Sequence, residues 1–166
     1  MRSHIQTCQE KDIVALDRAI TSHGDWHRKR FETQQKGETS YVIAWEEDIP
    51  VGHLNLIWGG SEQAEVRRHI KDCPELSAIW VWPPEKRSQG IGRALIAYAE
   101  ALAHSKGYAK IGLGVRTDNE RAQALYEKLG YEDWGRGVYH NRYTNFKQDG
   151  TRVEHDDPSY YLIKRL

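Results

Sequence analysis

Cysteine is scarce in this chain of 166 residues, which contains only Cys8 and Cys73. The two lie far apart and form no Cys-x-x-Cys pair, so neither a disulfide framework nor a zinc site is indicated. The eight histidines are scattered, and only His23 and His27 share the i,i+4 spacing of one helix face. Such a pair is weak evidence for a metal site. We therefore expect no bound metal.

Net charge and long apolar runs are also missing. The 24 Lys and Arg residues balance the 24 Asp and Glu residues, so no overall field draws the protein to nucleic acid or to an anionic membrane. No window reaches the roughly 18 apolar residues of a transmembrane helix. The opening stretch MRSHIQTCQEKD lacks the apolar core of a secretory signal. We expect a cytoplasmic protein that binds neither nucleic acid nor membrane.

The length suits one domain of ordinary size, and no repeat or linker divides the chain. We therefore predict a single domain over residues 1–166. Apolar spacing, β-branched runs and turn residues define the elements of the first half. They predict a helix at 11–20, a short helix at 26–35, hairpin strands at 39–47 and 51–58, a loop or partly helical insert at 59–75, and a strand at 76–82 stopped by two prolines.

The second half alternates helices and strands. The same signals predict a helix from 91 to a C-cap at Gly107, a strand at 110–115, a helix at 117–130, and strands within 131–146 and 160–166 around a turn at Asp149-Gly150. Thr117 and Glu120 have the spacing of a capping box at the start of the 117–130 helix. Such alternation predicts an α/β fold, with a mixed central sheet and helices packed on its faces.

The stretch KRSQGIGRALIAYAE, residues 86–100, places Gly90 and Gly92 at the start of an amphipathic helix. Glycines there let the unpaired N–H groups of the first turn approach an anion, typically a phosphate. A Walker loop would need Lys-Ser/Thr after the second glycine, but an Arg-Ala pair follows. A dinucleotide fingerprint would need a third small residue where Leu95 stands. What remains is an R-x-x-G-x-G pattern between a proline-stopped strand and a helix.

Downstream, NERAQALYEKLGY supplies Asn119, Ala122 and Tyr126 in an Asn-x-x-Ala-x-x-x-Tyr pattern. The two motifs, in this order, resemble those of the GNAT superfamily of acyl-CoA-dependent N-acetyltransferases, in which R-x-x-G-x-G binds the pyrophosphate of acetyl-CoA. The resemblance is specific over residues 76–134, and before that it is one of element order. The alternative, in which the glycines serve only helix packing, is disfavoured because both motifs occur together.

The resemblance implies a GNAT-like fold in which a mixed sheet splays two parallel strands apart to hold acyl-CoA. It also implies the activity, which is direct transfer of an acetyl group from acetyl-CoA to a primary amine in a ternary complex. The loop VWPPEKR holds one residue more than the family pattern, so either Val81 or Trp82 takes the strand-end position. The residues assigned to acyl-CoA binding are Val81, Trp82, Arg87, Ser88, Gln89, Gly90, Ile91, Gly92, Arg93, Asn119 and Ala122.

Two residues are assigned to catalysis by the same resemblance. Tyr126 stands at the family's general-acid position, and a phenol with a reference pKa of about 10 can protonate a departing thiolate. An amine with a reference pKa of about 10.4 must first lose a proton, so a base is needed. Glu75 lies just before the central strand, where related enzymes often place that base. The alternatives are a water relay and a purely solvated role for this carboxylate.

The acceptor site is less defined by the sequence. Trp80 and Trp82 are two apart on one predicted strand and so share a face, and aromatic walls beside carboxylates would suit a cationic amine. Core packing is the commoner role for each tryptophan. The candidates are Trp45 and Trp58 on the hairpin, the carboxylates Glu46, Glu47 and Glu75, and, in the connection of the first two helices, His23, Asp25, Trp26 and His27. We expect a small-molecule amine as acceptor, with polyamines, antibiotics and protein amines as the alternatives.

A second function is compatible with the same motifs. A catalytically idle acyl-CoA-binding module could act as a sensor or regulatory partner, although Tyr126 argues for an enzyme. The C-terminal stretch SYYLIKRL would also permit a homodimer through an edge strand.

Overall fold

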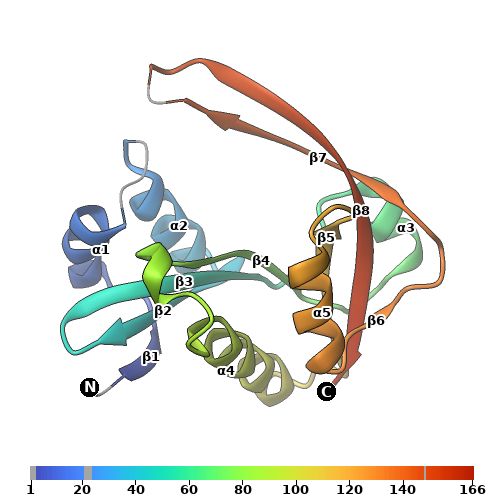
Figure 1. Ribbon diagram of the computed structural model, residues 1–166, viewed down its shortest axis with the longest axis horizontal. Coiled ribbons are helices and arrows are strands. Elements are labelled where there is room, and N and C mark those ends of the chain that lie inside the picture. Colours follow the sequence, from blue (N-terminus) through green and yellow to red (C-terminus); the bar gives the residue numbers. More distant parts are fainter. Residues whose placement is uncertain (1–2, 21–23, 148) are drawn as a thin grey trace.

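In the computed structural model, which describes residues 3–20, 24–147 and 149–166, the chain folds around one eight-stranded mixed sheet (Figure 1). Its strands are β1 (Ser3–Thr7), β2 (Thr39–Glu46), β3 (Ile49–Ile57), β4 (Glu75–Val81), β5 (Lys110–Arg116), β6 (Glu132–Asp133), β7 (Tyr139–Phe146) and β8 (Arg152–Arg165). Its helices are α1 (Ile13–Ala19), α2 (Trp26–Gln35), α3 (Ala64–His69), α4 (Ile91–Ser105) and α5 (Glu120–Lys128), with 3₁₀ turns at Glu10–Asp12 and Pro84–Lys86.

The strands lie in the order β1-β2-β3-β4-β5-β8-β6, and β7 pairs with β8 in a long hairpin. Strands β4 and β5 run parallel, and the other described pairs are antiparallel. Helices α4 and α5 pack on one face of the sheet, while α1, α2 and α3 pack on the other. The predicted α/β fold with helices on both faces is therefore confirmed.

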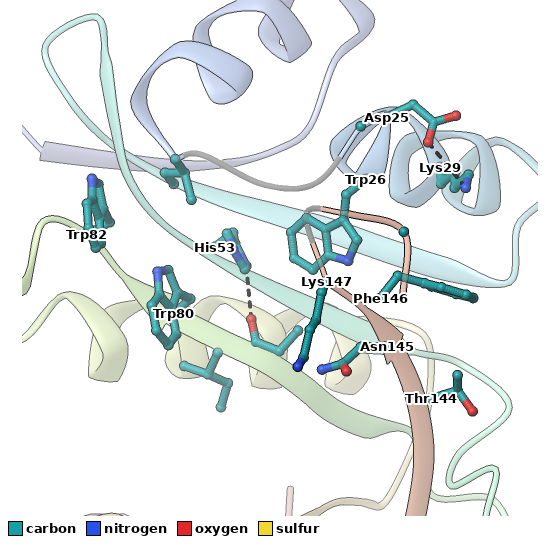
Figure 2. Close-up of a pocket in the computed structure, with 15 residues that line it drawn as sticks. Asp25, Trp26, Lys29, His53, Trp80, Trp82, Thr144, Asn145, Phe146 and Lys147 are labelled. Carbon is teal, nitrogen blue, oxygen red and sulfur yellow. Dashed lines mark hydrogen bonds and ion pairs between the residues drawn. The ribbon is translucent and has the colours of Figure 1, made fainter. Parts of the chain in front are cut away.

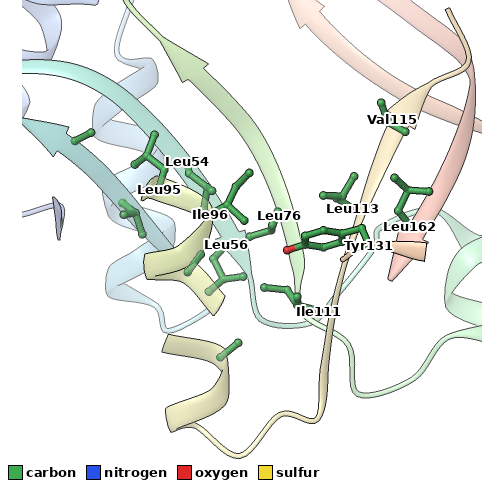
Figure 3. Packing of buried hydrophobic residues seen from close by; sticks show 14 of the residues in the cluster. Leu54, Leu56, Leu76, Leu95, Ile96, Ile111, Leu113, Val115, Tyr131 and Leu162 are labelled. Atoms are coloured by element: carbon green, nitrogen blue, oxygen red, sulfur yellow. The ribbon is translucent and has the colours of Figure 1, made fainter. Parts of the chain in front are cut away.

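The main core lies between the sheet and α4. Leu56, Leu76, Leu113 and Leu162 occupy matched positions across β3, β4, β5 and β8, so their side chains point to the same face. Leu95 of α4 packs on this apolar face and is fully buried (Figure 3). This cluster holds the start of β4 against the middle of β5, where the two strands are paired.

The opposite face carries two smaller clusters. Leu16 of α1 and Phe31 of α2 pack against Tyr41 of β2. Farther along the sheet, Val66 of α3 packs with Tyr161 of β8. Between these clusters, no helix covers the surface over β3 and β4 in the described part of the chain, and a cavity lies there.

The predicted elements are largely confirmed, with some corrections. Strand β8 begins at Arg152 and not at residue 160, because its first half pairs with β7. Strand β1 was not predicted, because Ser3–Thr7 contains a single strongly apolar residue and gains its order by pairing with β2. Helix α5 is capped by Asn119, whose side chain accepts a hydrogen bond from the Ala122 N–H, and not by a capping box at Thr117. In the described part of the chain no helix is both long and apolar enough to cross a membrane.

Strands β4 and β5 separate soon after they begin. They pair through Glu75 with Gly112 and Leu76 with Leu113, and beyond these positions β4 continues along β3 while β5 continues along β8. A bulge helps β4 to turn away: its register against β3 shifts between His53 and Asn55, and Ala78 opposite has a φ of 51°. The splayed parallel pair expected from the sequence is therefore present.

Two glycines of β5 make room for two buried tyrosines on the face of the sheet that α3 covers. A Cβ on Gly112 would lie 2.6 Å from the Tyr161 hydroxyl oxygen, and one on Gly114 would overlap the Tyr139 hydroxyl. Both tyrosines are almost completely buried. The glycines are therefore required by packing, because no side chain fits beneath these rings.

We expect Gly114→Ala to lower the free energy of unfolding by about 1–3 kcal/mol, because the added methyl group forces the Tyr139 ring to move. Urea denaturation measures this. Gly59→Ala is the control, because a Cβ there meets nothing within 4 Å. Tyr139→Phe in the Gly114→Ala background should recover part of the loss, and an equal loss in both backgrounds would show that the hydroxyl contact is not the cause.

Candidate active site

The loop between β4 and α4 exposes backbone N–H groups. Ser88 and Gly90 have positive φ angles of 64° and 88°. The chain therefore turns sharply just before α4 begins at Ile91. Gly90 is the N-cap and contributes no side-chain cap, and the first helical bond runs from the Ala94 N–H to the Gly90 oxygen at 3.0 Å. The preceding N–H groups of the helix are therefore available to an anion.

Val81 and Gly92 face one another beside this loop. Val81 is the last residue of β4, and a Cβ on Gly92 would lie 4.0 Å from its Cγ2 atom. Trp82 lies one residue beyond the strand and donates its N–H to the Val51 oxygen at 2.8 Å. Of the two residues left open by the sequence, Val81 is the last residue of β4 and Trp82 follows it.

Arginines surround the same loop. The Arg87 guanidinium carbon lies 4.9 Å from the centre of the Trp80 ring, and Arg87 Nε donates to the Val81 oxygen at 3.4 Å. Arg121, in the first turn of α5, donates to the Ser88 hydroxyl. This contact brings the two sequence motifs together, although they lie far apart in the chain. Arg93 is exposed on α4, and the Gln89 amide donates to the backbone of the preceding 3₁₀ turn.

Tyr126 lies on the face of α5 that packs on the core. It is partly buried, and its ring meets the Tyr131 ring edge-on at a centroid distance of 6.0 Å. Burial raises the pKa of the Tyr126 phenol above its ordinary value. The group is therefore protonated at neutral pH and can donate a proton.

A cavity of about 1050 Å³ lies on the other face of β4 (Figure 2). It is bounded by the start of α2, by β3 and β4, and by the tip of the β7–β8 hairpin, which extends from the far side of the sheet (Figure 1). Its aromatic walls are formed by Trp26 at the start of α2, Trp80 and Trp82 at the end of β4, and Phe146 at the end of β7. A cavity of this size is sufficient for a small-molecule substrate.

His53 forms part of the floor of this cavity. Its Nδ1 atom lies 2.9 Å from the Ala78 oxygen, and because a carbonyl only accepts, Nδ1 carries the hydrogen. Burial, with smaller contributions from Arg30 and His27, lowers the pKa of His53 to about 3. The imidazole is therefore neutral under ordinary conditions, and it holds the bulged segment of β4 in place.

Some acceptor candidates lie elsewhere. Trp45 is buried against α1 and α2, and Trp58 packs beside Tyr108. Glu46 pairs with Lys86 at 2.5 Å, and Glu47 is exposed in the β2–β3 turn.

The acceptor candidates in the connection between α1 and α2 also differ in whether they line the cavity. His27 is buried with both ring nitrogens engaged, one by the Tyr41 hydroxyl at 2.7 Å and one by the Ile20 oxygen at 2.8 Å. Asp25 and Trp26 do line the cavity, whereas His23 lies outside the described residues. The acceptor candidates that the cavity brings together are therefore Asp25, Trp26, Trp80 and Trp82.

Glu75 lies at the point where β4 and β5 separate and does not line the cavity. It accepts a hydrogen bond from the Tyr161 hydroxyl at 3.4 Å. Burial raises the pKa of its carboxyl to about 7, and the hydrogen bonds from Ser61 and Tyr161 oppose this effect. The carboxyl therefore changes its charge near neutral pH.

His53 and the hairpin tip were not predicted from the sequence. A histidine within a largely apolar strand was a signal that could have identified His53. Nothing in the pattern placed Phe146 or Lys147 beside β4, because the landing point of the hairpin depends on the twist and length of β7 and β8.

The chain matches the family model described as the acetyltransferase (GNAT) family over residues 9–131. A mycothiol acetyltransferase of Jonesia denitrificans is 36% identical over 113 residues, which are 64% of this chain and 34% of that protein. Another, from Kocuria rhizophila, is 32% identical over 96 residues, which are 57% of this chain and 30% of that protein. The chain thus spans about a third of the length of these curated relatives.

Solved structures share the fold over almost the whole chain. An N-acetyltransferase of Staphylococcus aureus Mu50 superposes with a TM-score of 0.70 at 18% identity, covering 99% of both chains. The PaiA N-acetyltransferase of Thermoplasma acidophilum, solved in complex with coenzyme A, gives a TM-score of 0.66 at 15% identity over 100% of both chains. Because the family model covers well over half of the sequence, the chain belongs to the acetyltransferase (GNAT) family.

Proposed function

We propose that this protein transfers an acetyl group from acetyl-CoA to the primary amine of a small molecule, in the cytoplasm. One observation carries the proposal: the edge of β4 that is free beyond Leu76 connects the exposed N–H groups at residues 88–92 with the aromatic cavity. A donor that bridges these two places would present its acyl end to an acceptor in the cavity.

The residues present fit the donor. Acetyl-CoA supplies an acetyl group activated as a thioester, together with a diphosphate that needs a cationic, N–H-rich site. The backbone of residues 88–92, with Arg87 and Arg93 at its flanks, would hold the diphosphate. Gly92 keeps the space above the loop free, and the unpaired edge of β4 would hold the amide groups of the pantetheine arm.

The side chains also supply the proton transfers. The unprotonated amine attacks the thioester carbon, the C–N bond forms, and the C–S bond breaks. The Val81 N–H polarises the carbonyl oxygen, and Tyr126 gives its phenolic proton to the departing thiolate. Glu75, outside the cavity, accepts the proton of the amine through intervening water. Asn119 and Ala122 act mainly by starting α5 correctly, which positions Tyr126.

Incubation with acetyl-CoA and a broad panel of amines tests this function. We expect free thiol and acetylated amine to appear in equal amounts. The sensor alternative predicts that acetyl-CoA raises the melting temperature while no amine is acetylated, and that result would contradict the proposed transferase.

Gly92→Ala tests whether the backbone N–H groups at the start of α4 bind the diphosphate. The residue has a helical conformation, so alanine should leave stability unchanged or raise it by up to about 1 kcal/mol. The methyl group would nevertheless occupy the space above the N–H groups, and we expect the dissociation constant for coenzyme A to rise about ten-fold or more. Calorimetric titration measures this, with Gly59→Ala as control. An unchanged dissociation constant would place the diphosphate elsewhere.

Tyr126→Phe tests the general acid. We expect kcat to fall on the order of 100-fold while the affinity for acetyl-CoA is retained, because the ring stays and only the proton donor is lost. Steady-state kinetics across pH provides the measurement. Tyr108→Phe, a partly buried tyrosine beside Trp58, should leave kcat unchanged. If the maximal rate of Tyr126→Phe equals that of the wild type at every pH, Tyr126 is not the acid.

Glu75→Gln tests the base. A folded-state pKa of about 7, above the reference value of 4.5, means that the folded protein binds this proton more tightly than the unfolded chain. Stability from this group is thus present at low pH and is lost as pH rises towards and through 7. We expect Glu75→Gln to be more stable than the wild type at pH 8 but similar at pH 5, by urea denaturation.

For the wild type we expect kcat/KM to rise as the pH increases through 7, because Glu75 then loses its proton. Glu75→Gln should lack this rise and should react on the order of 100-fold more slowly than the wild type above pH 7. A gain of stability at pH 8 without any change in the rate profile would restrict Glu75 to a structural role and leave water alone as the proton acceptor.

A further inference from the structure

We propose that the acceptor is an amine that also carries a flat apolar group and a carboxylate, as an aromatic amino acid does, and that it is not a polyamine. The inference rests on the proposed acetyl transfer. It comes from the composition of the cavity beside β4, where large aromatic surfaces and uncompensated positive charge occur together.

The aromatic side chains that line the cavity are unusually exposed to solvent. Trp80, Trp82 and Phe146 are 44%, 37% and 57% exposed, although all three line one cavity. Large exposed apolar side chains that converge on a hollow are typical of a ligand site, because a bound ligand covers them. Trp26 is held in position from behind by the Arg30 guanidinium, 3.8 Å from its ring centre. These walls fit a flat apolar group.

The charges of the cavity favour an anion. The lining contains Lys29 and Lys147, and its single described carboxylate, Asp25, lies 3.2 Å from Lys29 Nζ. No ion pair within the described residues includes Lys147. Arg30 adds a further positive charge behind Trp26. Within the described lining, two lysines and one aspartate leave one positive charge, which one carboxylate of the acceptor would neutralise.

Lys147 is placed to make that contact. Its side chain extends from the hairpin tip towards β4, and its ammonium group points into the cavity, on the side of Trp80 and Asn145 (Figure 2). A lysine presents one compact charge, which matches a monoanion such as a carboxylate. With Phe146 beside it, the hairpin tip would recognise both features of the acceptor.

The same charges disfavour a polyamine. Its additional ammonium groups would lie near Lys29, Lys147 and Arg30, where like charges repel. For a single reacting amine the positive excess is useful, because it lowers the pKa of the ammonium group and raises the fraction that can attack. The acceptor carboxylate and the reacting amine would then occupy different parts of the cavity.

Four acceptors distinguish the contributions of the aromatic ring, the carboxylate and additional ammonium groups. They are phenylalanine, phenethylamine, which lacks the carboxylate, alanine, which lacks the ring, and spermidine. We expect kcat/KM to be highest for phenylalanine and lowest for spermidine. Quenching of tryptophan fluorescence gives a second, turnover-independent readout, because Trp26, Trp80 and Trp82 line the cavity. None of these ligands contributes tryptophan emission.

Two variants connect the preference to the hairpin tip. Lys147→Met should reduce the ratio of kcat/KM for phenylalanine over phenethylamine by about five-fold, the size expected for a partly solvated ion pair. Phe146→Ala should reduce the ratio for phenylalanine over alanine in the same way. Lys36→Met, an exposed lysine at the end of α2, is the matched control and should change neither ratio.

The outcomes are distinct. Faster acetylation of spermidine than of phenylalanine, or ratios that Lys147→Met leaves unchanged, would overturn this inference and leave the transferase intact. Binding of phenylalanine by fluorescence without acetylation of any amine would support the ligand class and overturn the transferase. If phenylalanine neither binds nor reacts while another amine is acetylated, the inference is wrong.

Discussion

Strands β4 and β5 pair through only two matched positions, Glu75 with Gly112 and Leu76 with Leu113, before they separate. Each strand keeps its other neighbour, so the sheet stays intact while the edge of β4 that faces the gap loses its partner. Unpaired backbone groups that are shielded from water are costly, and an extended ligand with amide groups can satisfy them. The rest of the site depends on this separation.

In the proposed mechanism, this separation lets donor and acceptor approach from opposite faces of the sheet. Helices α4 and α5 occupy one face and bring the N–H groups at residues 88–92 close to the start of α5. The cavity occupies the other face, and the bulge at Ala78, held by His53, directs β4 between the two. In the account proposed here, the thioester carbon lies where the two faces meet. Tyr126 then acts from the helical side, and the amine approaches from the cavity.

Local patterns predicted most of the fold and the two segments that we propose hold the donor. The glycine-rich entry to α4, the motif around Tyr126 and the alternation of helices and strands are each contained within short stretches. The acceptor half was only partly predictable. Trp80 and Trp82 share a cavity as their spacing suggested, but Trp45 and Trp58 are used for packing, and Glu46 pairs with Lys86. Lys147 reaches the cavity through the long hairpin, so its position depends on tertiary geometry.

Hydrogen–deuterium exchange with and without acetyl-CoA reports on individual backbone amides and so shows where the donor binds. We expect slower exchange on addition of acetyl-CoA in two segments, the part of β4 beyond Leu76 and the first turn of α4 at residues 91–94. The paired residues of β2 and β3 should be much less affected. Protection confined to other segments, with unchanged exchange in β4 and at the start of α4, would contradict the claim that the separated strands hold the donor.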